Sequence, residues 1–192
     1  MALARTSNAM SSFNAQLVDI LHSKSIPAVG MSPHTLATVS HGKLRAFRDA
    51  AVAQFMEIGC VPVLYGDVVV DQQQGCSILS GDVTCCHLAR RLGADLAVFL
   101  SDVDGVYDSD PKIHGDAKLI SSIRRDQVGP VADFGGSPQR VNVTGEMRGK
   151  IECILGEPLS CDAVIANGFR REVLRAVVAG EQLGTRIPGL SS

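Results

Sequence analysis

The chain has 192 residues, of which 45% are apolar and 20% are charged, so it can build one packed domain or two small lobes. Its net charge of −2 gives no electrostatic basis for binding nucleic acid or an anionic membrane surface. No apolar run approaches the roughly 20 residues that span a bilayer, and residues 1–10 lack the apolar core of a secretory signal. We therefore expect a cytoplasmic protein, with a transit peptide in the acid-free residues 1–12 as the alternative.

The apolar pattern of the first half predicts helices, strands and one hairpin. Two segments carry apolar residues at helical spacing: residues 13–24, with Ser12 as a cap and Phe13, Leu17, Ile20 and Leu21 on one face, and residues 44–58, which Gly59 should end. Short apolar runs predict strands over 26–30 and 61–65. Residues 68–70 and 77–79 are predicted to pair as a hairpin.

The second half alternates regularly between helices and strands. Ser80 and Asp82 are predicted to cap a helix over 83–92 that Gly93 ends. The other expected elements are strands at 96–100, 163–166 and 184–187 and helices at 145–156 and 170–178, with irregular stretches at 101–116 and 129–142. This alternation indicates an α/β fold with a mostly parallel central sheet.

Cysteine and histidine do not form a recognisable chemical motif. None of the six cysteines belongs to a C-x-x-C pair, which favours reduced thiols. Cys85, Cys86 and His87 are adjacent on a predicted helix, so their side chains point roughly 100° apart and should not close on one ion. We therefore predict no protein metal site, and we interpret the five histidines as structural or exposed.

Polar turns follow three of the predicted strands. Ligands of open α/β sheets bind beyond the carboxyl ends of the strands, which directs attention to residues 66–67, 80–82 and 101–105. Gly81 begins a helix whose free N–H groups could hold a phosphate, and an ordinary helix cap is the alternative.

The turn after residue 100 carries two carboxylates. Asp102 and Asp104 could bind ribose hydroxyls or hold magnesium through water, or they could simply form a turn. Tyr107 could pack against a base or cover the loop. Lys150 lies one turn into a helix and could reach phosphate oxygens, although a solvated surface lysine is the common alternative.

Five segments occur together in the order seen in the amino acid kinase family. They are Gly30-Met31-Ser32-Pro33, residues 61–67 (VPVLYGD), residues 78–82 (ILSGD), residues 102–107 (DVDGVY), and residues 144–147 (TGEM) with Lys150. From about residue 11 onward the chain resembles this family, and most of all its isopentenyl phosphate kinases.

The resemblance implies a three-layer αβα sandwich and a phosphotransferase reaction. The chain would divide into a remnant of the substrate lobe, residues 1–65, and an ATP-binding lobe, residues 66–192. The two lobes would belong to one continuous amino acid kinase domain, which would run over residues 11–192. The reaction would use ATP and Mg²⁺ to phosphorylate a small molecule, isopentenyl phosphate, and a homodimer is possible. Two alternatives stay open: a non-catalytic nucleotide-binding module or degenerate copy, and a kinase for another small phosphate or phosphonate.

The resemblance also implies roles for single residues. Lys150 would be catalytic and face the ATP phosphates. The residues implied for the substrate are Gly66, Asp67, Ser80, Gly81 and Asp82, and those implied for ATP are Asp102, Asp104, Gly105, Tyr107, Asp110, Glu146 and Lys150.

The chain departs from the family pattern in two places. The family's opening strand, with a Gly-Gly turn and a lysine, and its later Gly-rich loop with a histidine have no counterpart before Ser11. Glu146 replaces the second glycine of Thr-Gly-Gly-Met, which places a carboxylate near the ATP phosphates. We therefore expect the isolated chain to be weakly active or inactive.

Overall fold

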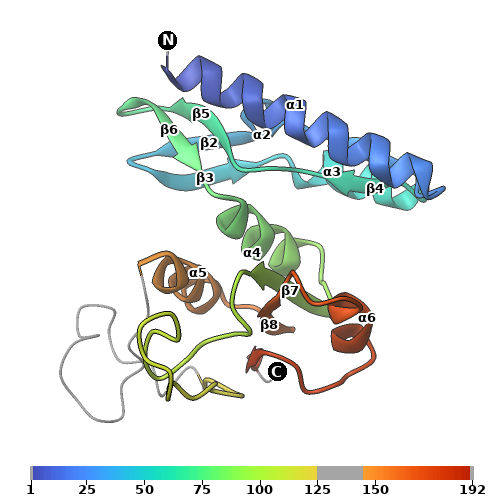
Figure 1. Cartoon of the computed structure of the whole chain (residues 1–192). Helices are drawn as coiled ribbons and strands as arrows, with labels where there is room; N and C mark the ends of the chain where they lie inside the picture. Colours follow the sequence, from blue (N-terminus) through green and yellow to red (C-terminus); the bar gives the residue numbers. More distant parts are fainter. Residues whose placement is uncertain (1, 125–144, 191–192) are drawn as a thin grey trace. The chain divides into compact units, whose positions relative to one another are not determined.

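A computed structural model describes residues 2–124 and 145–190 (Figure 1). The chain divides into two compact units, Met1–Cys85 and Cys86–Ser192. The division falls within helix α4 (Gly81–Arg91), and the boundary between substrate and ATP lobes expected at residue 65 stays a prediction. The assignment of substrate and ATP roles to the lobes stays a prediction. In the described parts of the chain, no helix has both the length and the apolar character needed to span a membrane.

The first unit contains three helices and two sheets among its described residues. Strands β1 and β4 pair in parallel, and the second sheet has the order β3-β2-β5-β6, in which β2 is parallel to β5 and the two hairpins are antiparallel. The elements are α1 (Ala2–Ser23), β1 (Ala28–Gly30), α2 (Pro33–Leu36), β2 (Ala37–Ser40), β3 (Lys43–Phe47), α3 (Asp49–Glu57), β4 (Val61–Val63), β5 (Asp67–Asp71) and β6 (Gly75–Leu79). The predicted hairpin of residues 68–70 and 77–79 is confirmed.

The helix predicted over 44–58 is wrong in its first part. His41 and Gly42 both have positive φ, 51° and 70°, as in tight hairpin turns, and they fold β3 back onto β2. Leu44 and Phe47 both pack against the core of this sheet. They belong to strand β3, whose pairing with β2 shifts register, and not to a helix. The helix begins only at Asp49, and Gly59, with φ of 83°, follows its end as predicted.

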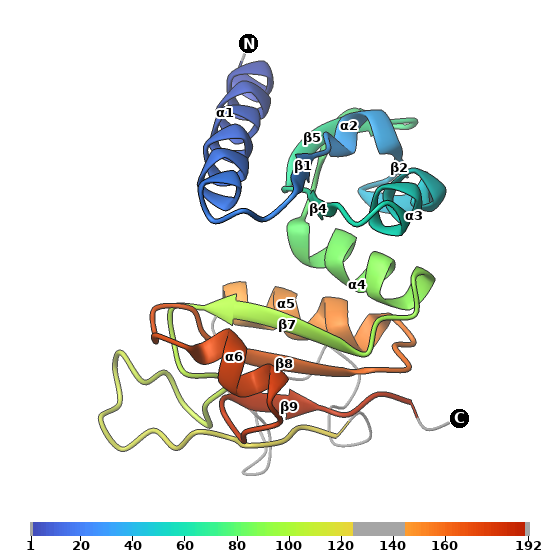
Figure 2. The same ribbon diagram turned by 90° about the vertical axis from the view of Figure 1, so that its right-hand side faces the viewer.

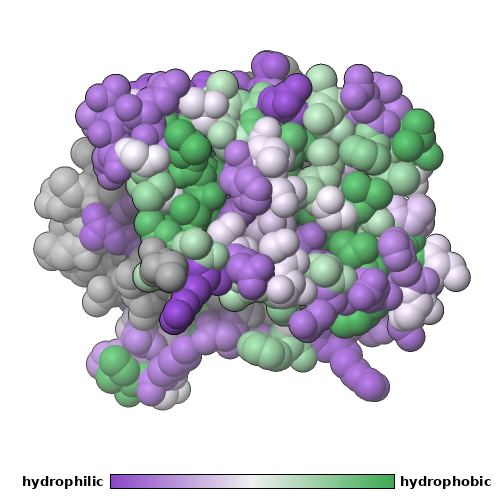
Figure 3. Space-filling model, turned by 90° about the horizontal axis from the view of Figure 1, so that it is seen from above, coloured by the Kyte–Doolittle hydropathy of each residue, from purple (hydrophilic) through white to green (hydrophobic). Residues whose placement is uncertain are grey.

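Helix α1 begins earlier than predicted and packs through a different face. Ser12 lies inside the helix, where its hydroxyl donates to the Asn8 carbonyl at 2.9 Å, so it is not a cap. Phe13 and Ile20, on the predicted apolar face, are 60% and 58% exposed. Instead Asn14 is buried and its amide donates to the Val63 carbonyl at 3.1 Å. Hydrophobic residues accordingly appear among hydrophilic ones on the surface that Figure 3 shows.

The second unit is a small three-layer sandwich in its described residues. Its sheet has the order β7-β8-β9, with β7 (Leu96–Ser101) parallel to β8 (Asp162–Asn167) and β9 (Thr185–Ile187) antiparallel to β8. Helices α5 (Gly145–Gly156) and α6 (Val173–Val178) cover opposite faces of this sheet (Figure 2). The predicted α/β class is thus confirmed.

Alternating side chains of β8 supply both faces of this sandwich. Val164 and Ala166 pack against Val173 and Val177 of α6, while Ala163 and Ile165 are buried on the opposite side. The predicted helix at 170–178 is shorter in the structure, because Glu172 has a φ of 61° and the helix begins at Val173. The irregular stretch predicted at 129–142 lies outside the described residues.

The buried carboxylate of Asp71 joins the two hairpin turns of the first unit. It accepts hydrogen bonds from the backbone N–H groups of His41 and Gly42, at 3.1 and 2.8 Å, and from those of Gln73 and Gln74, at 2.9 and 3.1 Å. These bonds, that of Gly42 most of all, hold the pKa of Asp71 well below its usual range. Asp71 is therefore a structural carboxylate that should stay ionised in the folded protein.

We expect Asp71→Asn to destabilise the protein, because an amide offers one acceptor oxygen where four N–H groups now meet a carboxylate. A carboxyl whose pKa falls on folding stabilises the protein above its unfolded pKa of about 4 and loses this contribution as the pH falls. Urea unfolding should show a clear deficit for Asp71→Asn at pH 7 and a smaller one near pH 3.

Asp19→Asn, which changes an exposed residue of α1, is the matched control and should differ little from the native protein at either pH. Equal deficits for Asp71→Asn at both pH values would contradict the proposed role of its charge.

Candidate functional site

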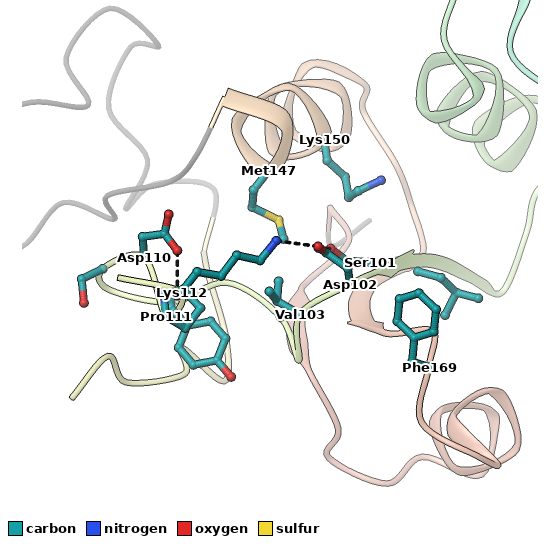
Figure 4. A pocket seen from close by; sticks show the side chains of 14 residues that line it. Ser101, Asp102, Val103, Asp110, Pro111, Lys112, Met147, Lys150 and Phe169 are labelled. Carbon is teal, nitrogen blue, oxygen red and sulfur yellow. Dashed lines mark hydrogen bonds and ion pairs between the residues drawn. The ribbon is translucent and has the colours of Figure 1, made fainter. Parts of the chain in front are cut away.

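A cavity of about 560 Å³ opens in the second unit beyond the carboxyl ends of β7 and β8 (Figure 4). Its lining comes from three places: most of the residues between 100 and 112, at and after the end of β7, Met147 and Lys150 of α5, and Gly168 and Phe169 after β8. Parallel neighbours end at the same edge of a sheet, where ligands of open α/β folds bind.

Most residues predicted to bind ATP line this cavity. Asp102, Gly105, Tyr107, Asp110 and Lys150 are all found there. Asp104 does not line the cavity, and the side chain of Glu146 lies outside the described residues. The structure thus brings the ATP set together, while the role of each residue in binding stays a prediction.

An ion pair bridges the middle of the cavity. The Lys112 ammonium donates to an Asp102 carboxylate oxygen at 2.6 Å, and this contact lowers the pKa of Asp102 (Figure 4). Asp110 accepts the backbone N–H of Lys112 at 2.9 Å, so its carboxylate also shapes the turn that presents this lysine. The sequence interpretation missed Lys112, because only its place beside the Asp110-Pro111 turn singles it out.

Lys150 approaches the cavity from α5. Its ammonium lies 5.6 Å from the centre of the Phe99 ring, within range of a cation–π interaction, and Met147 of the same helix also lines the cavity. Two lysines therefore reach the cavity from different elements, which suits the spread charge of a polyphosphate.

Gly105 allows the segment after β7 to pack closely on β9. A Cβ at this position would lie 2.7 Å from the Thr185 hydroxyl and 2.9 Å from the Thr185 backbone nitrogen. That buried hydroxyl accepts the Val106 N–H at 2.8 Å and donates to the Ile120 carbonyl at 2.6 Å. Thr185 thus fixes one wall of the cavity onto the sheet.

The residues predicted for the substrate fall into two groups. Gly66 approaches the start of α4 so closely that a Cβ there would lie 3.2 Å from the Gly81 nitrogen. Ser80 caps this helix as predicted, since its hydroxyl accepts the Asp82 N–H at 3.1 Å. The structure therefore brings Gly66 together with residues 80–82 in the first unit.

Asp67 belongs to the second of these groups because it points into the first unit. It is only 1% exposed, its carboxylate lies 2.7 Å from Nδ1 of His34, and it accepts its neighbour Val68's N–H at 2.7 Å. Its oxygens are thus engaged by protein groups, and contact with a substrate stays a prediction. His34, which the sequence interpretation left as structural or exposed, orients this carboxylate.

The described residues contain no group of three or more His, Cys, Asp or Glu side chains placed to hold a metal ion. Magnesium usually keeps several waters and binds through one or two carboxylates together with substrate phosphates. Asp102 and Asp110 supply carboxylates of this kind to the cavity. The donor set therefore fits a magnesium ion that arrives with a nucleotide.

We expect the Tyr107 phenol to titrate above its ordinary pKa of about 10, because burial raises the pKa and the nearby Asp104 carboxylate raises it further. Since the chain has two tyrosines and no tryptophan, Tyr65→Phe leaves Tyr107 as the sole reporter in a phenolate absorbance titration. Adding Asp104→Asn to that background should lower the midpoint. A midpoint at or below 10 in the folded protein, verified by circular dichroism, would contradict the described environment.

Comparisons with known proteins agree with this geometry. The profile of the amino acid kinase family matches residues 1–156. Isopentenyl phosphate kinases of Methanothermobacter thermautotrophicus and Methanocaldococcus jannaschii are 34% and 32% identical over 97% and 93% of the chain, which spans 70% and 65% of their lengths. A crystal structure of an isopentenyl phosphate kinase superposes with a TM-score of 0.80 at 32% identity, covering 96% of this chain and 69% of that one.

The order of the strands, the cavity at the ends of β7 and β8 and these similarities lead to one conclusion. The chain belongs to the amino acid kinase family.

Proposed function

We propose that the protein binds ATP in the cavity at the ends of β7 and β8 and transfers its γ-phosphoryl group to isopentenyl phosphate. The observation that carries the nucleotide part is the convergence of Lys112, Lys150 and two carboxylates on one cavity of suitable size. The similarity to proteins named isopentenyl phosphate kinase supports the choice of acceptor. Products would be isopentenyl diphosphate and ADP.

The charges of the cavity suit the nucleotide end of this reaction. Lys150 and Lys112 would neutralise phosphate oxygens, and Asp102 and Asp110 would hold Mg²⁺ through water. When bound with ATP, Mg²⁺ would offset the charge that develops between the β- and γ-phosphates. Catalysis of this kind depends mainly on positioning and on neutralisation of charge, which fixed lysines provide.

The start of α4 suits the acceptor end. Gly66 and Gly81 carry no side chain that would cover each other's backbone nitrogen beside Ser80, at the positive end of an eleven-residue helix. An oxygen of the acceptor phosphate would attack the γ-phosphorus, and the bond from that phosphorus to the bridging oxygen of ADP would break. Ser80, Gly81, Asp82 and Gly66 are thus proposed substrate residues, and Asp67 is proposed to support them from inside the unit.

Several further properties remain predictions of the family resemblance. These are a requirement for Mg²⁺, a homodimer and a cytoplasmic location.

We expect Lys150→Met to weaken ATP binding by about 10- to 100-fold in isothermal titration calorimetry, because it removes a charge-assisted contact to phosphate. Lys24→Met, which removes an exposed positive charge at the end of α1, is the matched control and should bind ATP like the native protein. Equal affinities for both variants would contradict the placement of the phosphates at Lys150.

Product analysis distinguishes the proposed function from its two alternatives. With ATP, Mg²⁺ and isopentenyl phosphate, we expect isopentenyl diphosphate to form faster with the native chain than with Lys150→Met, even if slowly. Binding of ATP without product from any acceptor would support a non-catalytic nucleotide-binding module. If the protein phosphorylates another small phosphate or phosphonate faster than isopentenyl phosphate under the same conditions, the result would support the second alternative, a kinase for another substrate.

A further inference from the structure

Asp104 is held by protein groups at both of its carboxylate oxygens. One oxygen accepts the side-chain amide of Asn167 at 2.9 Å, and the other pairs with the guanidinium of Arg170. The Asp104 side chain is 27% exposed, against 55% for Asp102, which does line the cavity. Each Asp104 oxygen therefore already has a protein donor, and the residue does not line the cavity.

The partners of Asp104 belong to the opposite wall of the cavity. Its chain neighbours Val103 and Gly105 line one wall, whereas Gly168 and Phe169, which lie between Asn167 and Arg170, line the other. Asp104 therefore ties together two segments that are more than sixty residues apart in the chain.

Asn167 also bonds to the backbone of the wall that carries Phe169. The side-chain oxygen of Asn167 accepts the Phe169 N–H at 2.9 Å, so the amide that holds Asp104 also sets the turn carrying Phe169. The Gly168 N–H donates to the carbonyl of Ser101, the last residue of β7, at 2.9 Å. This bond also links the segment after β8 to the segment after β7. The Phe169 side chain, 85% exposed, has little packing of its own to fix its place on the wall.

We propose that Asp104 is a positioning residue of the nucleotide site, which holds the two walls of the cavity in their binding arrangement through Asn167 and Arg170 without contacting the nucleotide or its metal. This inference rests on the proposed binding of ATP in the cavity. Its physical basis is preorganisation: two loops that are fixed before binding need not be ordered by the ligand. It also replaces the earlier expectation that Asp104 binds ATP directly.

A double-mutant cycle on ATP affinity tests this proposal. We expect Asp104→Ala and Arg170→Met each to weaken ATP binding by about tenfold, and the double variant to bind no more weakly than either single one, since both changes release the same tie. The dependence of affinity on Mg²⁺ should keep its native midpoint in all three variants. Asp116→Ala, in an exposed part of the segment after β7, should bind like the native protein.

Two outcomes would overturn the proposal. Direct ligation by Asp104 would make the losses additive, or would leave Arg170→Met unaffected while Asp104→Ala shifts the Mg²⁺ midpoint. Should Asp104→Ala fail to fold by circular dichroism, Asp104→Asn serves in its place, because it keeps an acceptor for Asn167 and loses only the charge that pairs with Arg170.

Hydrogen exchange of the ligand-free protein separates this proposal from the proposed function. Asp104→Ala should speed exchange both in residues 102–112 and in residues 167–170, and Asp116→Ala should not. If the native protein binds no ATP, the proposed function fails and the nucleotide role of Asp104 fails with it, while exchange still decides whether Asp104 ties the walls. Faster exchange in only one of the two segments would refute the tie itself.

Discussion

The parallel pairing of β7 with β8 is the constraint on which the site depends. The register runs without a break from Leu96 opposite Asp162 to Ser101 opposite Asn167, so both strands end at the same edge of the sheet. Each strand then continues into a polar segment, and these two segments form facing walls of the cavity. Apolar side chains are buried on both faces of β8 and stabilise this pairing. Their burial keeps water away from the backbone hydrogen bonds between β7 and β8.

The balance of charge in the cavity follows from that geometry. Asp102 and Lys112 neutralise each other in the absence of a nucleotide, but both side chains are more than half exposed, and exposed ion pairs contribute little to stability. Lys112 can therefore exchange its carboxylate for a phosphate at small cost. Asp104 differs, because it is less exposed and has two protein donors. Two aspartates separated by one residue thus acquire different tasks from their surroundings.

Local signals in the sequence were sufficient where one short segment determines its own structure. The continuous apolar run of β7, the glycines after α3 and α4, and the Ser80 cap each depend on neighbouring residues, and the structure confirms them. The β2–β3 hairpin was missed because Leu44 and Phe47 also fit a helical stripe, and only the positive φ at His41 and Gly42 reveals the turn.

Partnerships between distant residues could not be predicted in this way. From the sequence, Asn14 resembles a polar surface residue, and only its hydrogen bond to the distant Val63 carbonyl explains why it is buried. The Asp104–Arg170 pair likewise joins residues that are far apart in the chain. The candidate ATP residues were found because five of them lie in the loop after β7, the other two, Glu146 and Lys150, lie in α5, and both segments resemble family motifs. Only the three-dimensional structure distinguishes those that line the cavity from Asp104, which bonds to other protein residues.

The most direct test of this account is a crystal structure of the protein with a non-hydrolysable ATP analogue and Mg²⁺. We predict the triphosphate in the cavity at the ends of β7 and β8, within hydrogen-bond distance of Lys150 and Lys112, with Asp104 still bonded to Asn167 and Arg170. An analogue bound elsewhere, or bound there with its phosphates directed away from both lysines, would contradict the account.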